Sequence, residues 1–157
     1  MKNTFKRSGA ALISLVLLLV LAVSAGAANS QNVGVKFWKE RSDKESMANS
    51  GIDPDRTATL TRQANGTYTL TLPVMQVSKL GVTGYLSGLT IGDVTYDGTL
   101  TGDFNKATAV LTIKNLPASV LTGSDVNKSV LVTCNIQMDL SLLGEINTTA
   151  RMCIWAK

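Results

Sequence analysis

The sequence predicts an all-β domain, a sandwich of short antiparallel strands with one short helix near its N-terminal end. Apolar residues alternate with polar ones in several short stretches, as in strands that bury one face. Clusters of Gly, Asn and Asp separate these stretches, and no long helical period follows residue 28. Residues 43–51 are the exception, because a polar stretch that ends at Gly51 predicts one or two helical turns.

The clearest strand signal is a hairpin around Asn65-Gly66, a dipeptide that tolerates the positive φ angles of a tight turn. After this turn, Tyr68, Leu70 and Leu72 fall on one face of an alternating strand. The remaining stretches are bounded in the same way by turn residues. The expected strands cover residues 57–63, 67–77, 84–91, 93–100, 107–114, 130–140 and 148–156.

The first 27 residues are typical of a secretory signal peptide. A cationic start precedes an apolar run over residues 10–22, and Ala25-Gly26-Ala27 gives the small-x-small pattern that signal peptidase needs. We expect cleavage after Ala27, with Ala28 as the alternative. An uncleaved membrane anchor is the competing interpretation, but the run is shorter than the roughly 20 residues of a bilayer span. We therefore expect a secreted or cell-surface protein with no membrane span after cleavage.

Residues 28–157 then form one domain, long enough to bury a core. The chain carries 15 Lys and Arg against 11 Asp and Glu. Three of the basic residues lie in the signal segment, so the mature domain has 12 against 11 and is nearly neutral. A basic surface for nucleic acid is therefore not expected.

The composition also excludes the common catalytic arrangements. The chain has no histidine, so the usual triads and imidazole metal sites are absent. The nearest carboxylate groupings are Asp53 with Asp55, and Asp93, Asp97 and Asp103. Asp97-Gly98 is typical of a turn, and the spacing does not match a calcium loop. We expect turn residues here, no metal site, no catalytic residue and no enzyme.

Two cysteines, Cys134 and Cys153, fall on the last two expected strands. A symmetric hairpin centred between Leu143 and Gly144 would place them directly opposite each other, close enough for a bridge. Export favours an oxidising compartment. A disulfide between Cys134 and Cys153 is therefore predicted, with two buried free thiols as the alternative.

Two stretches together resemble the near-iron-transporter (NEAT) domain, the haem-binding immunoglobulin-like module of Gram-positive surface proteins. Ser46-Met-Ala-Asn-Ser-Gly51, followed by residues 58–72, is similar to the family's short helix and first hairpin. Residues 109–117 and the final pair of strands are similar to the family's closing strands. The resemblance covers residues 45–156. It implies an immunoglobulin-like β-sandwich with one short N-terminal helix, haem as ligand, and iron transport at the bacterial cell surface.

The sequence departs from the family at the iron ligand. Haem-binding members carry two tyrosines four residues apart on the last hairpin, and these positions fall at Ile146 and Ala150 here. Met152 shares their face and carries a thioether that can act as an axial ligand, although core filling is the competing role. The resemblance thus implies a groove under the short helix with these candidate ligand-binding residues: Ser46, Met47, Ile146, Ala150, Met152 and Ile154.

The function predicted from the sequence is an exported, non-enzymatic binding module for haem or another flat apolar ligand. The alternative is a surface domain that binds a protein or a glycan on the same scaffold without a haem pocket. Such a surface needs aromatic anchors. The candidates are Trp38, Tyr85, Tyr96 and Trp155.

Overall fold

The computed structural model describes residues 29–79, 81–139 and 144–157. The predicted signal segment, residues 1–27, lies outside these residues, so its export function stays a prediction. The described chain is all-β, with strands joined by turns and by four short 3₁₀ helices. No helix in the described ranges has the length and apolar character needed to cross a membrane.

Most described residues lie in strands, and several of these strands begin or end at other residues than expected from the sequence. They are β1 Ser30–Lys39, β2 Ala58–Arg62, β3 Tyr68–Pro73, β4 Val77–Lys79, β5 Val82–Ile91, β6 Val94–Thr101, β7 Val110–Leu116, β8 Val130–Met138 and β9 Glu145–Ala156. The short helices are η1 Met47–Gly51, η2 Phe104–Lys106, η3 Ala118–Val120 and η4 Val126–Lys128.

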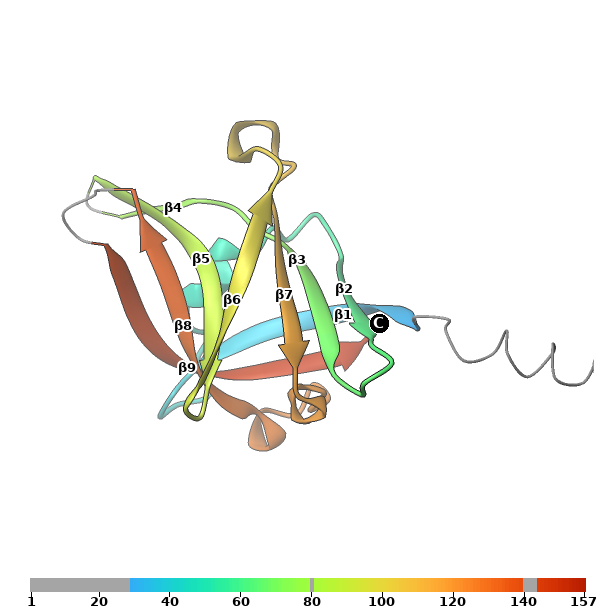
Figure 1. The fold of residues 1–157 in the computed structure, drawn as a ribbon. Helices are drawn as coiled ribbons and strands as arrows, with labels where there is room; N and C mark the ends of the chain where they lie inside the picture. The colour runs from blue at the N-terminus through green and yellow to red at the C-terminus, as the bar shows by residue number, and fades with distance from the viewer. Residues whose placement is uncertain (1–28, 80, 140–143) are drawn as a thin grey trace, which may run out of the picture.

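The strands form one antiparallel sheet that closes on itself. Their order is β4-β5-β6-β7-β3-β2-β1-β9-β8, and β5 also pairs with β8, which joins the two ends (Figure 1). The sequence predicted a β-sandwich, and the structure does not confirm it, because these strands form a single closed sheet. In β5, the register with β8 shifts between Leu86 and Gly88. Such a bulge bends and twists a strand, and here it accompanies closure of the sheet.

The predicted first hairpin is confirmed. β2 pairs with β3 through Thr59 opposite Thr71 and Thr61 opposite Thr69. Gly66 has a φ of 82°, which a non-glycine side chain rarely adopts. β1 was missed, although it lies between β2 and β9.

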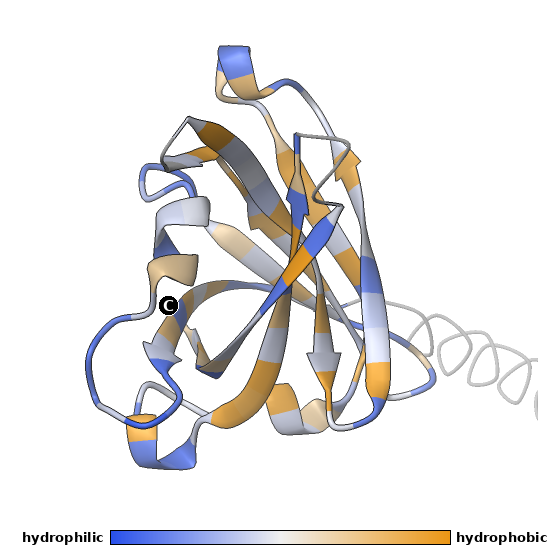
Figure 2. Ribbon diagram, turned by 90° about the vertical axis from the view of Figure 1, so that its left-hand side faces the viewer, coloured by the Kyte–Doolittle hydropathy of each residue, from blue (hydrophilic) through white to orange (hydrophobic). Residues whose placement is uncertain are grey.

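One apolar core fills the inside of the closed sheet. Hydrophobic residues alternate along the strands, while hydrophilic ones gather in the connections (Figure 2). The strands β1, β2, β3, β7 and β9 each contribute side chains that are sealed from solvent. The largest of these are Phe37, Leu60, Leu70, Leu72, Leu111, Ile113, Leu116, Met152 and Ile154.

Candidate functional site

The helix η1 is fixed against β1 by its own side chains. The amide of Asn49 pairs with the backbone of Phe37 in both directions: Phe37 N donates to Asn49 Oδ1 at 2.8 Å, and Asn49 Nδ2 donates to Phe37 O at 2.7 Å. Ser46 N also donates to Phe37 O at 2.9 Å. At the start of the helix, Ser46 Oγ accepts from Ala48 N at 3.3 Å, an N-cap contact. Asn49 thus takes the place of a neighbouring strand beside Phe37.

Replacing Asn49 with alanine should lower the free energy of unfolding by about 1–3 kcal/mol, because the Phe37 N–H loses its side-chain acceptor. Denaturant unfolding measures this loss. Asn105→Ala is the control, since Asn105 is an exposed asparagine in another 3₁₀ helix, η2. We expect that control to stay within about 0.5 kcal/mol of the wild type. Equal stability for Asn49→Ala and the wild type would show that the amide pairing does not hold η1.

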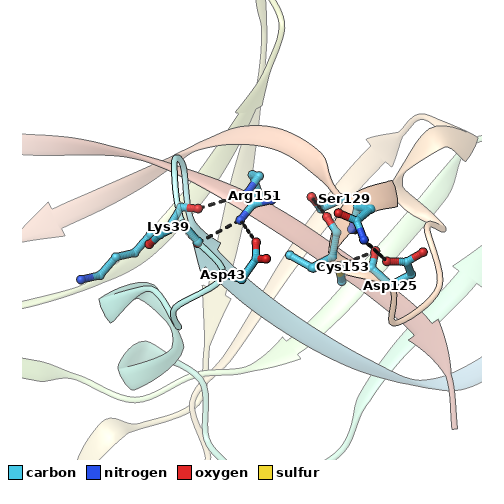
Figure 3. A network of polar contacts seen from close by, with 9 residues as sticks. Lys39, Asp43, Asp125, Ser129, Arg151 and Cys153 are labelled. Atoms are coloured by element: carbon cyan, nitrogen blue, oxygen red, sulfur yellow. Dashed lines mark hydrogen bonds and ion pairs between the residues drawn. The ribbon is translucent and has the colours of Figure 1, made fainter.

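A second clamp holds the connection between β1 and η1. Arg151, on the outer face of β9, donates to Lys39 O at 3.1 Å and to Ser42 O at 2.9 Å, and it pairs with Asp43 Oδ1 at 2.8 Å (Figure 3). One guanidinium group therefore ties the last residue of β1 and two residues of the connection to β9. The loop enters η1 from a fixed position.

Beneath η1 lies a pocket of about 300 Å³, which we name the η1 pocket. Its wall comes from five elements, with β5, β8 and β9 opposite the helix and β4 at the side. The lining residues are Met47, Ala48, Gly51, Val77, Val82, Gly84, Tyr85, Leu86, Ile136, Met138, Ile146 and Thr148.

The lining is almost wholly apolar, and none of its twelve residues carries a charge at neutral pH. Side-chain heteroatoms come from the sulfurs of Met47 and Met138 and the hydroxyls of Tyr85 and Thr148. The Tyr85 ring packs on Phe104, with 5.2 Å between ring centroids. Burial of apolar surface is therefore the main interaction that this pocket offers a ligand.

The structure brings only part of the sequence-predicted site together. Met47 and Ile146 line the η1 pocket, and both are exposed, at 57% and 44%. Ser46 caps the helix beside them. Three residues lie elsewhere: Ala150, Met152 and Ile154 are fully buried in the core and are not part of the lining.

The ladder between β8 and β9 explains this division. Ile146 pairs with Ile136 near the start of β9, whereas Met152 pairs with Val130 at the other end of the ladder and with Phe37 of β1. All these inward positions share one face, but only those near the start of β9 reach the pocket. Met152 therefore fills the core rather than facing a ligand.

Sequence reasoning predicted two of the twelve lining residues, Met47 and Ile146, and missed the other ten, which include Met138, Gly84 and Thr148. Met138 ends the inward series of β8 and pairs with Gly84 of β5. Alternation within each strand marks their faces, but the pairing of β5 with β8 was needed to bring them together. The sequence thus indicated which face of its strand each residue lies on, but not which residues of neighbouring strands are paired.

The predicted disulfide is absent, because both cysteines are buried free thiols. The predicted turn centre falls partly outside the described residues, but the ladder beside it places Cys134 opposite Thr148. Cys153 lies opposite Lys36 of β1. Since neighbouring residues of a strand point to opposite faces, Cys153 turns away from the core face that Cys134 and Met152 share. Its sulfur instead contacts Asp125 O at 3.6 Å (Figure 3).

Burial raises the pKa of the Cys134 thiol from 9.0 to about 12. The unfolded chain therefore loses this proton at a lower pH than the folded chain does, so the contribution of Cys134 to stability is present below pH 9.0 and falls between pH 9.0 and about 12. At pH 10.5 we expect a loss of about 2 kcal/mol that Cys134→Val does not show. Urea unfolding at pH 8 and pH 10.5 measures it. An equal alkaline loss in both proteins would contradict the assignment to Cys134.

The acidic residues that the sequence singled out lie in a cap, a turn, a strand and an ion pair. Asp103 caps η2 by accepting from Asn105 N at 2.9 Å, and Asp93 lies in the turn between β5 and β6. Asp97 was expected in a turn, but it lies inside β6 opposite Gly88. Asp53 lies 3.7 Å from the guanidinium of Arg56. Across the part of the chain that the structure describes, no three acidic, cysteine or histidine residues gather as a metal site.

The closed all-β sheet with a short helix beside an apolar pocket is a NEAT-like fold. The chain matches the NEAT5 domain of IsdX2, a B. anthracis hemophore, in complex with heme, with a TM-score of 0.50 and 11% identity, over 81% of this chain and 95% of that one. A point mutant of the same domain, also in complex with heme, matches with the same TM-score and identity, over 94% of its chain. No family model and no curated protein matches the sequence. The likeness at this identity is one of fold.

Proposed function

We propose that this chain is an exported, non-enzymatic binding module of NEAT-like type that holds a flat apolar ligand in the η1 pocket, with haem as the ligand to test first. The observation that carries the proposal is an apolar pocket beneath a short helix, in a fold that resembles a haem-bound hemophore domain. Export follows from the signal predicted in residues 1–27. The protein would then act outside the cell, at its surface or released from it, in the uptake of iron.

The lining residues fit a porphyrin by their chemistry. Aliphatic side chains of β5, β8 and β9 suit its apolar faces. A volume of about 300 Å³ lies at the low end of the roughly 300–1,000 Å³ found for ligand sites. We therefore expect one edge of the ligand to stay in solvent beside Met47 and Ile146. Haem would supply an iron atom, toward which the sulfurs of Met47 and Met138 are the candidate donors.

Aromatic side chains give less support to a protein- or glycan-binding surface. The four candidate anchors, Trp38, Tyr85, Tyr96 and Trp155, are all half-buried. Lys36 Nζ lies over the Trp38 ring, 4.6 Å from its centroid. The ring of Trp155 occupies the space where a side chain on Gly34 would begin. Because these rings already pack within the domain, the pocket is the better candidate site.

Titration of the protein with haem tests the proposal, with metal-free protoporphyrin IX as the second probe. We expect saturation at one molecule per chain, a shifted Soret band for haem and enhanced fluorescence for the metal-free ring. The same titration of an unrelated β protein of the same size controls for aggregation of the porphyrin. Unaltered spectra with both probes would refute a flat apolar ligand and leave a protein partner as the function to examine.

A further inference from the structure

The η1 pocket offers a ligand no carboxylate and no imidazole. Its lining contains neither acid nor histidine, and its side-chain oxygens are the hydroxyls of Tyr85 and Thr148. The donors in the lining with an affinity for soft metal ions are thioethers, which are neutral. They come from two sides of the pocket, Met47 from η1 and Met138 from β8.

Met138 is built into the wall. It pairs with Gly84 of β5, and its Sδ lies 2.8 Å from the point where a Cβ on Gly84 would stand. The sulfur therefore occupies space that only a glycine opposite it leaves open. The backbone oxygen of Gln137 and a methyl group of Ile136 lie beside the same point, at 2.9 Å and 3.3 Å. Met138 is half-buried and is one of the residues that line the pocket.

Such a site should distinguish the two oxidation states of haem iron. Ferric haem carries one more positive charge than ferrous haem, and an apolar pocket without a counter-charge disfavours that extra charge. A neutral thioether also binds the softer ferrous iron better, which is why methionine ligation raises haem potentials. Both effects act in the same direction.

Resting on the proposed function, we infer that the η1 pocket binds ferrous haem in preference to ferric haem, with Met138 as the residue that sets this preference. The expected preference is at least about tenfold, which corresponds to a rise of about 59 mV in the potential of the one-electron couple on binding. The metal-free ring has no iron for the Met138 sulfur to bind, so its affinity reports only how this side chain packs against the ring.

The test compares three probes on one protein: ferric haem, haem kept ferrous with dithionite under nitrogen, and metal-free protoporphyrin IX. The same titrations are made with Met138→Leu, a substitution of similar volume. Met75→Leu is the matched control, because Met75 is an exposed methionine outside the lining. The ratio of ferrous to ferric affinity is compared between variants, so the behaviour of free haem cancels.

We expect the ferrous preference in the wild type and in Met75→Leu, and its loss in Met138→Leu, in which the affinity for ferrous haem falls by more than the affinity for the metal-free ring. If no probe binds, the proposed function itself fails. If all three bind equally well, the function stands and the oxidation-state preference is overturned. A preference that survives Met138→Leu overturns the role of Met138 alone.

Discussion

Replacing Gly51 with leucine is expected to weaken ligand binding by at least about 100-fold while the domain stays folded. Gly51 lies at the end of η1 and lines the pocket. A Cβ built on it meets nothing closer than Val77 Cγ2 at 3.9 Å, and Val77 belongs to the same lining. The added side chain therefore has room to enter the space that the ligand would use. A loss of that size equals about 2.7 kcal/mol of binding free energy.

Gly51→Ala is the matched control for this experiment. Gly51 does not have a positive φ angle, so alanine can adopt its backbone conformation. Restricting the unfolded chain should then stabilise the protein by about 0.4–1 kcal/mol, with binding largely retained. The paired readouts are porphyrin titration and denaturant unfolding. Unimpaired binding by a folded Gly51→Leu protein would place the ligand somewhere other than the η1 pocket.

Truncating Met152 to alanine should lower the free energy of unfolding by about 2–5 kcal/mol, the usual cost of a cavity at a large buried side chain. Met152 is fully buried opposite Phe37, at the far end of the β8–β9 ladder from the pocket. Thermal or denaturant unfolding measures the loss. The protein will be marginal if its total stability is low, so a milder substitution is needed for the binding measurement.

Met152→Leu provides that substitution, because it keeps the volume and should cost less than about 1.5 kcal/mol. We expect its haem spectrum and affinity to match the wild type, in contrast to Met138→Leu. A Met152→Leu protein with an altered Soret band would restore Met152 as a ligand candidate and contradict its place in the core.

Local patterns were enough to predict the all-β class and the first hairpin. The Asn65-Gly66 turn and the alternation of Leu70 and Leu72 are short-range signals, and both act within a few residues of the chain. The polar stretch ending at Gly51 predicted one or two helical turns over residues 43–51, and the structure has a 3₁₀ helix, η1, at Met47–Gly51. Its 3₁₀ form and its position depend on the Asn49 amide and on the backbone of a strand twelve residues away.

Long-range pairing could not be predicted in the same way. The closure of the sheet depends on β5 and β8, whose paired residues Gly84 and Met138 are far apart in the sequence. The disulfide prediction depended on an assumed hairpin centre, and the actual register puts Thr148 opposite Cys134. Three of the six predicted site residues lie in the core instead of the pocket for the same reason, since register decides which inward residue reaches the pocket.

The methionines of this chain can report where the ligand binds. Four methionines lie in the described residues and have distinct surroundings: Met47 and Met138 line the pocket, Met75 is exposed outside it, and Met152 is buried in the core. Their methyl groups can be labelled with ¹³C and followed by NMR while metal-free protoporphyrin IX is added. Substitution of each methionine by leucine assigns its signal.

We predict that the Met47 and Met138 methyl signals shift together and saturate at one ligand per chain, because the ring current of the porphyrin acts only at short range. The Met75 and Met152 signals should remain nearly unchanged. Shifts confined to Met75, or no shift at Met138 when the ligand is bound, would contradict the η1 pocket as the binding site.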